Sequence, residues 1–305
     1  MYIIDLYKRM IRKANVSVLI YLILNVWIIT SVIYVLFGND GAISYSQSFF
    51  IGIMLYLISL TIALSPIGEW ILRLQTGCKK IKRFDQKEFL EPIFNEVYIK
   101  AKTQDPSIND NIQLFMSDDE VPNAFATGRK TICITKGLLQ IPEDQIKATL
   151  AHEFGHLAHK DTDLILVVSV GNLIINTFII GIRFFIEFFH IIINTILAFA
   201  TGPEGLFISM MNSIYHLSLT LIVAGLTKLW TWVGTMLVMK SSRENEYEAD
   251  AFAYHLGYGN ELCMMLDTFD GSSAKGLFAS LVSSHPIKDD RIAQLQELGA
   301  TYRYF

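Results

Sequence analysis

The chain has 305 residues, of which 52% are hydrophobic and 18% are charged, with a formal net charge of −4. Ordinary soluble domains are about 45–50% apolar and about 25% charged, so this composition favours an integral membrane protein. The small net charge excludes the strongly basic balance typical of nucleic-acid binding, and we expect no nucleic-acid partner.

Two long apolar runs open the chain. Residues 16–37 carry no charge and are long enough for about 30 Å of helix, the usual hydrocarbon thickness. A second run extends from Phe49 to about Leu72, after the polar loop "GNDGAISYSQS", and is interrupted only near its end, by Pro66 and Glu69. The two runs predict an N-terminal transmembrane hairpin over residues 1–72. Basic residues flank it on both outer sides and are missing from its loop, namely Lys8, Arg9, Arg12, Lys13, Arg73, Lys79, Lys80, Lys82 and Arg83. By the positive-inside rule both flanks are expected to be cytoplasmic.

Residues 73–163 have a soluble composition. "QKEFLEPIFNEVYIKAK" predicts an amphipathic helix, with one apolar row through Phe89, Ile93 and Val97. "NIQLFM" and "RKTICIT" predict short strands, and "VPNAFATG" between them predicts a strand and a turn. A second helix is expected to begin near "PEDQ", where a proline and two acids suit a helix N-terminus.

The remaining sequence repeats this order of membrane and soluble segments. Residues 164–200 and 206–239 are apolar blocks divided by "TGPEG", and they predict a second transmembrane hairpin over 164–239. Arg183 and Glu187 lie four apart in the first block, which favours a structural ion pair over a functional relay. Residues 240–305 are soluble, with helical patterns around "ENEYEADAFAYHLG" and "KDDRIAQLQELG".

The second predicted helix of the soluble segment contains "HEFGH". His152 and His156 are four apart, so they project from one helix face, and Glu153 lies beside them. This is the HExxH pattern, in which two imidazoles bind zinc and the carboxylate acts on a water molecule. With seven histidines in the chain, chance would produce it in about 0.008 of such sequences. A buried helix with two hydrogen-bonded histidines is the structural alternative.

A zinc site of this kind needs a third protein ligand. His159 lies about 10 Å along the helix axis from His152, which makes it a poor candidate. "SSRENEYEADAFAYH" is a better source, because Glu246 and Asp250 are four apart. One carboxylate could bind the metal while the other orients a histidine. Without the HExxH pattern, a merely solvated acidic helix would be the more plausible interpretation.

Membrane topology gives an independent test of this pairing. Glu246 can reach a metal on His152 only if the chain crosses the membrane an even number of times between them. Two apolar blocks separate the two residues, and Lys240 and Arg243 follow the second block, as expected for a cytoplasmic return. The site is therefore expected on the cytoplasmic side of the membrane.

Four motifs in this order resemble the HtpX-type membrane zinc metalloproteases, relatives of the CAAX prenyl endopeptidases. They are "VPNAFATGR", "HEFGHLAHKD", "SSRENEYEADAFA" and "SSHPIKDDRI". The motifs lie between residues 73 and 295, and the layout of four spans covers the whole chain.

The resemblance implies one zinc ion per chain, bound by His152, His156 and Glu246. It also implies Glu153 as general base and acid, and Asp250 as the acid that orients a ligand. Asn123 and His285 are implied to hold substrate or the oxyanion, for which an amide and an imidazole N–H are suitable donors. From the residues alone, a turn former and a surface histidine are the alternatives for these two positions.

The sequence thus predicts an α-helical integral membrane protein with about four transmembrane helices and a cytosolic α+β zincin-like catalytic domain, built from residues 73–163 and 240–305. The resemblance implies an endopeptidase that degrades membrane or misfolded proteins in a bacterial inner membrane, with extended substrates added to the strand of "VPNAFATG". A prenyl-protein endopeptidase and a catalytically silent membrane scaffold are the alternatives. The lipid bilayer is the other expected partner.

Overall fold

The computed structural model describes residues 15–38, 41–268 and 288–303. The described residues form two compact units. One unit comprises Ile20–Ile62 and Val168–Gly234, and the other comprises the described parts of Met1–Leu19, Ala63–Val167 and Thr235–Phe305.

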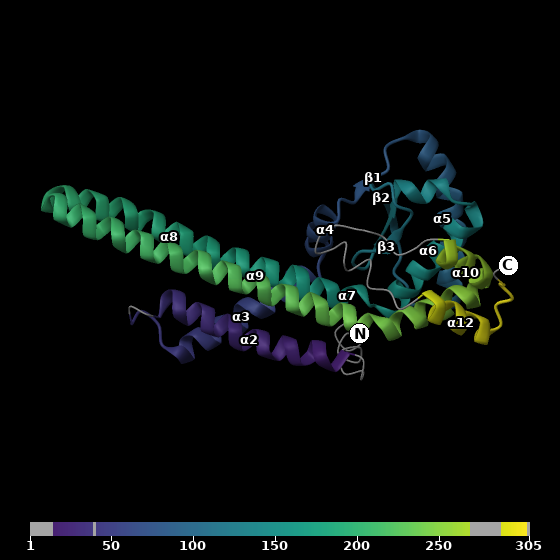
Figure 1. Cartoon of the computed structure of the whole chain (residues 1–305), viewed down its shortest axis with the longest axis horizontal. Coiled ribbons are helices and arrows are strands. Elements are labelled where there is room, and N and C mark those ends of the chain that lie inside the picture. Colours follow the sequence, from purple (N-terminus) through teal and green to yellow (C-terminus); the bar gives the residue numbers. More distant parts are fainter. Residues whose placement is uncertain (1–14, 39–40, 269–287, 304–305) are drawn as a thin grey trace. The chain divides into compact units, whose positions relative to one another are not determined.

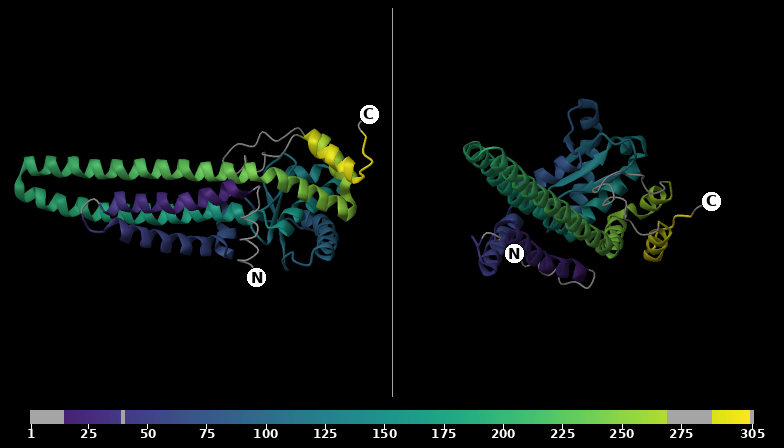
Figure 2. Two further views of the ribbon diagram at one scale, coloured as in Figure 1. Left: turned by 90° about the horizontal axis from the view of Figure 1, so that it is seen from below. Right: turned by 60° about the vertical axis from the view of Figure 1, so that its left-hand side comes forward.

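The first of these units is built from long apolar helices. It contains most of α2 (Val16–Phe37) and α3 (Tyr45–Ala63), all of α8 (Gly171–Thr201) and the first part of α9 (Pro203–Ala253). Helices α8 and α9 run side by side over their common length (Figures 1 and 2). Within the described residues, four helical stretches are long and apolar enough to cross a membrane: Val16–Phe37, Tyr45–Ala63, Thr162–Ile196 and Pro203–Val238. Helices of sufficient length and apolarity for the four expected spans are therefore present.

Polar side chains join α2 to α8 and α9. Asn172 donates to the Tyr21 hydroxyl at 2.6 Å, and the Asn25 amide donates to Asn172 at 2.6 Å. The Trp230 indole donates to Asn25 at 3.0 Å and stacks on the Tyr21 ring. A Cβ atom at Gly234 would lie 2.2 Å from that ring, so only glycine permits this close approach. Small residues and interhelical hydrogen bonds are the usual means of packing helices in lipid, where the hydrophobic effect contributes little.

The second apolar run differs from its expected extent. In place of one helix over residues 49–72, α3 ends at Ala63 and a separate helix, α4 (Pro66–Gln75), follows. The Ser65 side chain accepts from the Ile67 N–H, and Pro66 occupies the first helical turn. Because serine caps helix N-termini and proline cannot continue a preceding helix, the chain restarts at this point.

The other unit contains a four-stranded sheet in the order β1-β2-β4-β3. Its strands are β1 (Lys79–Lys80), β2 (Gln113–Ser117), β3 (Ala124–Ala126) and β4 (Thr131–Thr135). Strands β2 and β4 are parallel, and the other two pairs are antiparallel. The three strands predicted from the sequence are confirmed, and β3 lies at an edge of the sheet (Figure 1).

Helices complete this unit. They are α5 (Phe84–Gln104), the 3-10 helix η2 (Lys136–Gln140), α6 (Glu143–His159), α7 (Thr162–Ile165), the π-helical turns η3 (Leu166–Val170) and η4 (Tyr254–Tyr258), α10 (Gly259–Thr268), α12 (Lys288–Leu298), and the end of α9. α5 and α6 match the two predicted helices.

The core of this unit lies between α5, α6 and the sheet. Ile93 and Val97 of α5 are buried as expected. The ring of Phe94 packs against the ring of Phe154 in α6, with 5.6 Å between the ring centroids. Phe89, expected in the same buried row, is 43% exposed. The next residue, Leu90, is fully buried in the core instead, so the buried face of α5 runs through Leu90 rather than Phe89. This packing fixes α6, the helix that carries the HExxH residues.

Candidate metal centre

The two histidines of the HExxH pattern lie on one face of α6. Their Nε2 atoms are 3.2 Å apart, and the rings are nearly perpendicular with centroids 4.8 Å apart. One donor atom each from His152, Glu153 and His156 can be chosen so that all three lie within 4.8 Å of one another. The i, i+4 spacing thus brings two imidazole donors and a carboxylate to one point.

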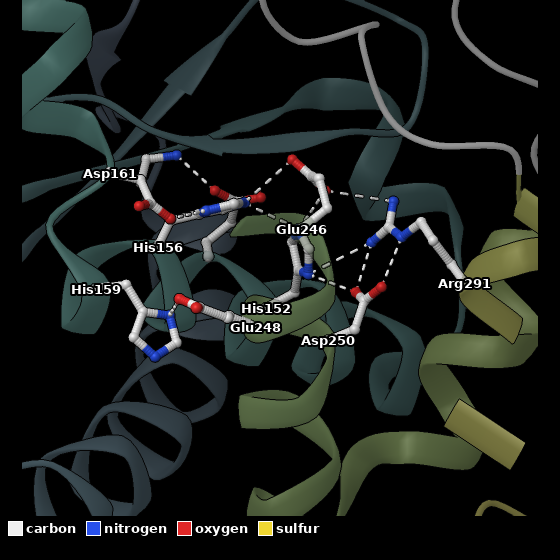
Figure 3. Close-up of polar contacts among 10 residues, drawn as sticks. His152, His156, His159, Asp161, Glu246, Glu248, Asp250 and Arg291 are labelled. Carbon is white, nitrogen blue, oxygen red and sulfur yellow. Dashed lines mark hydrogen bonds and ion pairs between the residues drawn. The ribbon is translucent and has the colours of Figure 1, made fainter. Parts of the chain in front are cut away.

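Glu246 of α9 reaches the same point (Figure 3). Its Oε2 lies 3.3 Å from His152 Nε2, and its Oε1 lies 3.5 Å from His156 Nε2. Zinc binds nitrogen and carboxylate oxygen at about 2.0–2.2 Å in a tetrahedral arrangement, which places neighbouring donors about 3.3 Å apart. The two imidazole nitrogens are this far apart, and each has one oxygen of the Glu246 carboxylate at a similar distance, so these residues fit a zinc ion.

A close helix contact brings Glu246 and Asp250 to the histidines. A Cβ atom at Gly155 would lie only 2.8 Å from Ala249 Cα and 3.1 Å from its carbonyl oxygen. Glycine in the middle of a helix costs about 1 kcal/mol relative to alanine. Here it allows α6 and α9 to approach almost to backbone contact, which places the α9 acids beside the α6 imidazoles.

Each histidine has a carboxylate on its second ring nitrogen. Asp250 lies 2.8 Å from His152 Nδ1, and Asp161 lies 3.0 Å from His156 Nδ1. A carboxylate in this position fixes the ring orientation and makes the other nitrogen a better ligand. The arrangement leaves both Nε2 atoms to face Glu246.

Asp161 reaches His156 because of how α6 ends. Lys160 has a left-handed backbone, with φ 59° and ψ 34°. Its N–H donates to the Leu157 carbonyl, and the Asp161 N–H donates to the His156 carbonyl. These two bonds form a Schellman motif, which reverses the chain after the last helical turn. The reversal brings Asp161 back to a ligand of the same helix.

Arg291 of α12 pairs with two of the acids. Its Nε and Nη2 donate to the two oxygens of Asp250 at 2.7 and 2.6 Å, and its Nη1 lies 3.5 Å from Glu246. Burial raises the pKa of Asp250, but the adjacent Arg291 guanidinium outweighs it and lowers that pKa to about 2. Burial lowers the pKa of His152, but Asp250 and Glu246 outweigh it and raise that pKa to about 10. A cation bound by the His152 imidazole would take the place of its proton.

Glu153 faces the edge strand. Its Oε2 accepts a hydrogen bond from the backbone N–H of Ala126, in β3, at 2.6 Å. Asn123 directly precedes β3, and its backbone N–H donates to the Thr135 hydroxyl at 2.8 Å. β3 therefore lies beside the carboxylate of the HExxH pattern. His285, the other residue expected to contact substrate, lies outside the described residues.

Not every acid and histidine of these two helices belongs to the metal centre. Glu248 lies two residues after Glu246 but contacts His159, with 3.9 Å between its Oε2 and His159 Nδ1. His159 and Glu248 thus lie apart from the three converging donors (Figure 3). Asp161 and Arg291 were not identified from the sequence, although "HLAHKD" and "KDDRI", which contain them, belong to the resembling motifs.

Comparison with known proteins identifies the family of the chain. The profile of peptidase family M48 matches residues 85–299, more than half of the chain. A protease HtpX homolog of Tropheryma whipplei (strain TW08/27) is 26% identical, with 90% of this chain and 96% of that protein covered. A protease HtpX homolog of Neisseria meningitidis serogroup C (strain FAM18) is 28% identical over 58% of this chain and 63% of that protein. The crystal structure of S. mikatae Ste24p gives a TM-score of 0.40 at 18% identity, covering 93% of this chain and 66% of that one. The chain belongs to peptidase family M48 and is a membrane-bound metalloprotease.

Proposed function

We propose that the chain is a zinc-dependent endopeptidase whose metal is held by His152, His156 and Glu246. The observation that carries this assignment is that the two Nε2 atoms and the Glu246 carboxylate lie within 3.2–3.5 Å of one another. A bound zinc ion supplies Lewis acidity and lowers the pKa of a coordinated water towards about 7. Asp250 and Asp161 orient the two imidazoles, and Arg291 holds Asp250 in place.

Glu153 is the proposed general base and acid. Its carboxylate takes a proton from the water that attacks the peptide carbonyl and returns it to the leaving amine. In the structure one of its oxygens accepts from the Ala126 N–H of the edge strand. A substrate added in extended form along β3 would lie next to this carboxylate. Asn123 and His285 are proposed to donate hydrogen bonds to the substrate or the developing oxyanion.

The proposed role is the degradation of membrane or misfolded proteins in a bacterial inner membrane. Residues 73–163 and 240–305 would form a cytosolic α+β zincin-like catalytic domain, between transmembrane hairpins 1–72 and 164–239. The basic residues on the outer flanks of the apolar segments support this orientation. If a cysteine accessibility scan placed residues 201–205, "TGPEG", on the cytoplasmic side, it would contradict the two crossings on which the orientation depends.

The decisive experiment measures zinc content and cleavage of a model membrane protein by the full chain in detergent. Wild type is expected to bind one zinc and cleave. Glu153→Gln should keep the zinc and lower kcat by about 10²–10⁴-fold, and Glu246→Ala should lose the metal. Glu248→Ala is the matched control, since it removes an acid of the same helix that contacts His159 instead. If Glu246→Ala and Glu248→Ala gave the same zinc content and cleavage, Glu246 would not be the third ligand. Unchanged cleavage by Glu153→Gln would favour the scaffold alternative.

A further inference from the structure

Helix α4 (Pro66–Gln75) has an exposed apolar face. Ile67, Trp70 and Leu74 are 56%, 54% and 61% exposed and lie three and four residues apart, so they share one side of the helix. The opposite side is buried and consists of Gly68, Glu69 and Leu72. The helix starts three residues after Ala63, where the second candidate membrane span ends. An apolar face this close to the end of a membrane span lies within reach of the lipid surface.

We propose that α4 is an interfacial helix that inserts Ile67, Trp70 and Leu74 into the membrane surface and holds the active-site strand with its buried face. Tryptophan is enriched at the level of the lipid headgroups, and helices with one apolar face bind there in the plane of the membrane. Lys80 and Lys82 follow α4 and are exposed, as suits contact with anionic headgroups. The partner of this face is therefore the bilayer that the adjoining span crosses.

The buried face of α4 holds the turn between β3 and β4. Gly128 in this turn has φ +73°, and a Cβ atom there would lie 2.5 Å from Glu69 Cγ. The Glu69 carboxylate accepts from the Arg129 N–H at 3.0 Å, and Arg73 donates to the Thr131 hydroxyl at 2.9 Å. The turn thus fits against α4 with no space for a side chain at Gly128.

The same turn is held from its other side by the start of the third apolar segment. The Thr162 hydroxyl donates to the Gly128 carbonyl at 2.5 Å, and Arg129 Nε lies 3.0 Å from the fully buried Asp163. Thr162 and Asp163 are the first two residues of α7. The turn is therefore fixed between two segments that adjoin the ends of membrane spans.

This anchoring reaches the catalytic carboxylate. Ala126, two residues before Gly128, donates its N–H to Glu153 Oε2. A continuous series of contacts therefore runs from the lipid-facing helix through Glu69, the turn and β3 to Glu153. This last step, in which α4 positions the strand for catalysis, rests on the proposed function of Glu153.

The lipid contact can be tested without any measure of catalysis. A nitroxide is attached at Trp70→Cys in the full chain, in vesicles of phosphatidylcholine and phosphatidylglycerol, and its collisions with oxygen and a water-soluble nickel complex are compared. The control is Glu88→Cys, at an exposed position of α5. Cys78, Cys133 and Cys263 are free but buried, so the unsubstituted chain reports any background labelling.

We expect oxygen to reach position 70 more readily than nickel, with the opposite order at position 88. Equal nickel access at both positions would overturn the proposal, and so would protection of position 70 from both reagents, which would indicate a second copy or another protein.

The coupling to the active site is tested with two pairs of variants. Trp70→Asp should lower kcat in vesicles about fivefold at unchanged zinc content, whereas Trp70→Leu should remain close to wild type. Glu69→Leu, which removes the acceptor for the Arg129 N–H, should act like Trp70→Asp, and Glu69→Gln, which keeps an acceptor, should not. Wild-type kcat for both Trp70→Asp and Glu69→Leu would refute the coupling. If wild type itself failed to cleave, the proposed function would fail, while the nitroxide result would still decide the lipid contact.

Discussion

This chain has two buried clusters of charged and imidazole groups, and each contains a pair of residues four apart on one helix. The two clusters differ in how closely their side chains converge. At the metal centre, His152 and His156 are four apart on α6, and their partners lie at 2.8–3.5 Å. In α8, Arg183 and Glu187 are also four apart, but their closest charged atoms are 3.9 Å apart. Arg183 donates to His216 of α9 at 2.7 Å, while its Nε and Glu187 Oε1 have no hydrogen-bond partner within the described residues. The ion pair expected from the sequence is therefore present, though loose.

The difference shows that helix spacing is not sufficient to make a metal site. The centre on α6 also has a glycine that allows a second helix to approach, a chain reversal that brings Asp161 back to His156, and an arginine that pairs with Asp250 and Glu246. In the cluster of Arg183, Glu187 and His216, the charged atoms of Arg183 and Glu187 stay 3.9 Å apart and Arg183 contacts His216 instead. Substitutions that remove these additional features should therefore weaken metal binding.

The largest effect is expected from Arg291→Met. Arg291 is the buried cation between Asp250 and Glu246, and loss of a residue that orients ligands typically lowers metal affinity 10–100-fold. Competition with a chelator measures the zinc affinity. Arg83→Met is the control, because Arg83 forms an exposed pair with Asp85 and its loss should leave the affinity unchanged. Equal affinities for the two variants would show that Arg291 has no part in the site.

Gly155→Ala tests the close helix contact. A methyl group there would meet the Ala249 backbone, and overpacking of this kind costs about 1–3 kcal/mol. We expect a lower Tm and reduced zinc content, because the α9 acids move away from the histidines. Gly181→Ala in α8 is the matched helical control, since nothing lies within 4 Å of a Cβ atom there. A stabilised Gly155→Ala protein with full zinc content would contradict the close contact.

The α8 cluster is tested by removing both of its charges. An Arg183→Met, Glu187→Met double variant replaces a loose buried ion pair with apolar groups, a change that is often neutral or stabilising. Zinc content and cleavage should stay within about twofold of wild type, and Tm should not fall. A folded double variant that lost cleavage would show that Arg183 and Glu187 contribute to function.

The smallest effect concerns an exposed acid of α5. Lys147 lies 2.9 Å and Lys100 lies 3.1 Å from the Glu96 carboxylate, and these hydrogen bonds lower the pKa of Glu96 to about 2. An unfolded glutamate titrates near about 4.3. The pairs therefore stabilise the fold above that pH, and the stabilisation is lost as the pH falls towards 2. The side chain is 42% exposed, so solvent screening limits the effect to below about 1 kcal/mol.

The measurement for this prediction is the Tm difference between wild type and Glu96→Gln at several pH values. It should shrink between pH 6 and pH 3. Glu88→Gln, which removes another exposed acid of α5, controls for the change in net charge. If the Tm difference grew as the pH fell, the Glu96 pairs would not stabilise the fold in the way assigned here.

Several features were predictable because their signals are local. Residues 16–37 lack any charge, and α2 occupies this range. The HExxH spacing places two imidazoles together on any regular helix. The interruption of the second apolar run at Pro66 was also visible locally, but the apolar residues on both sides gave no sign that a separate helix begins there.

Other features depend on distant contacts or on unusual backbone geometry. Arg291 meets Asp250 across 41 residues of sequence, and no pattern near either residue indicates the pair. Asp161 reaches His156 because Lys160 adopts a left-handed conformation that is usually taken by glycine or asparagine. The need for glycine at position 155 is set by Ala249, which belongs to another helix. Their places at the site follow from packing, so the structure was needed to identify them.

The position of the histidines along α6 has an electrostatic consequence. His156 lies in the last turn of the helix, and His152 lies one turn earlier. Aligned peptide dipoles give the C-terminal end of a helix a charge equivalent to about −0.5 of an electron charge. A cation bound by these imidazoles would lie in the negative end of that dipole, and a bound anion would be disfavoured. The direction of the helix therefore selects for positive charge at the site before any side chain contributes.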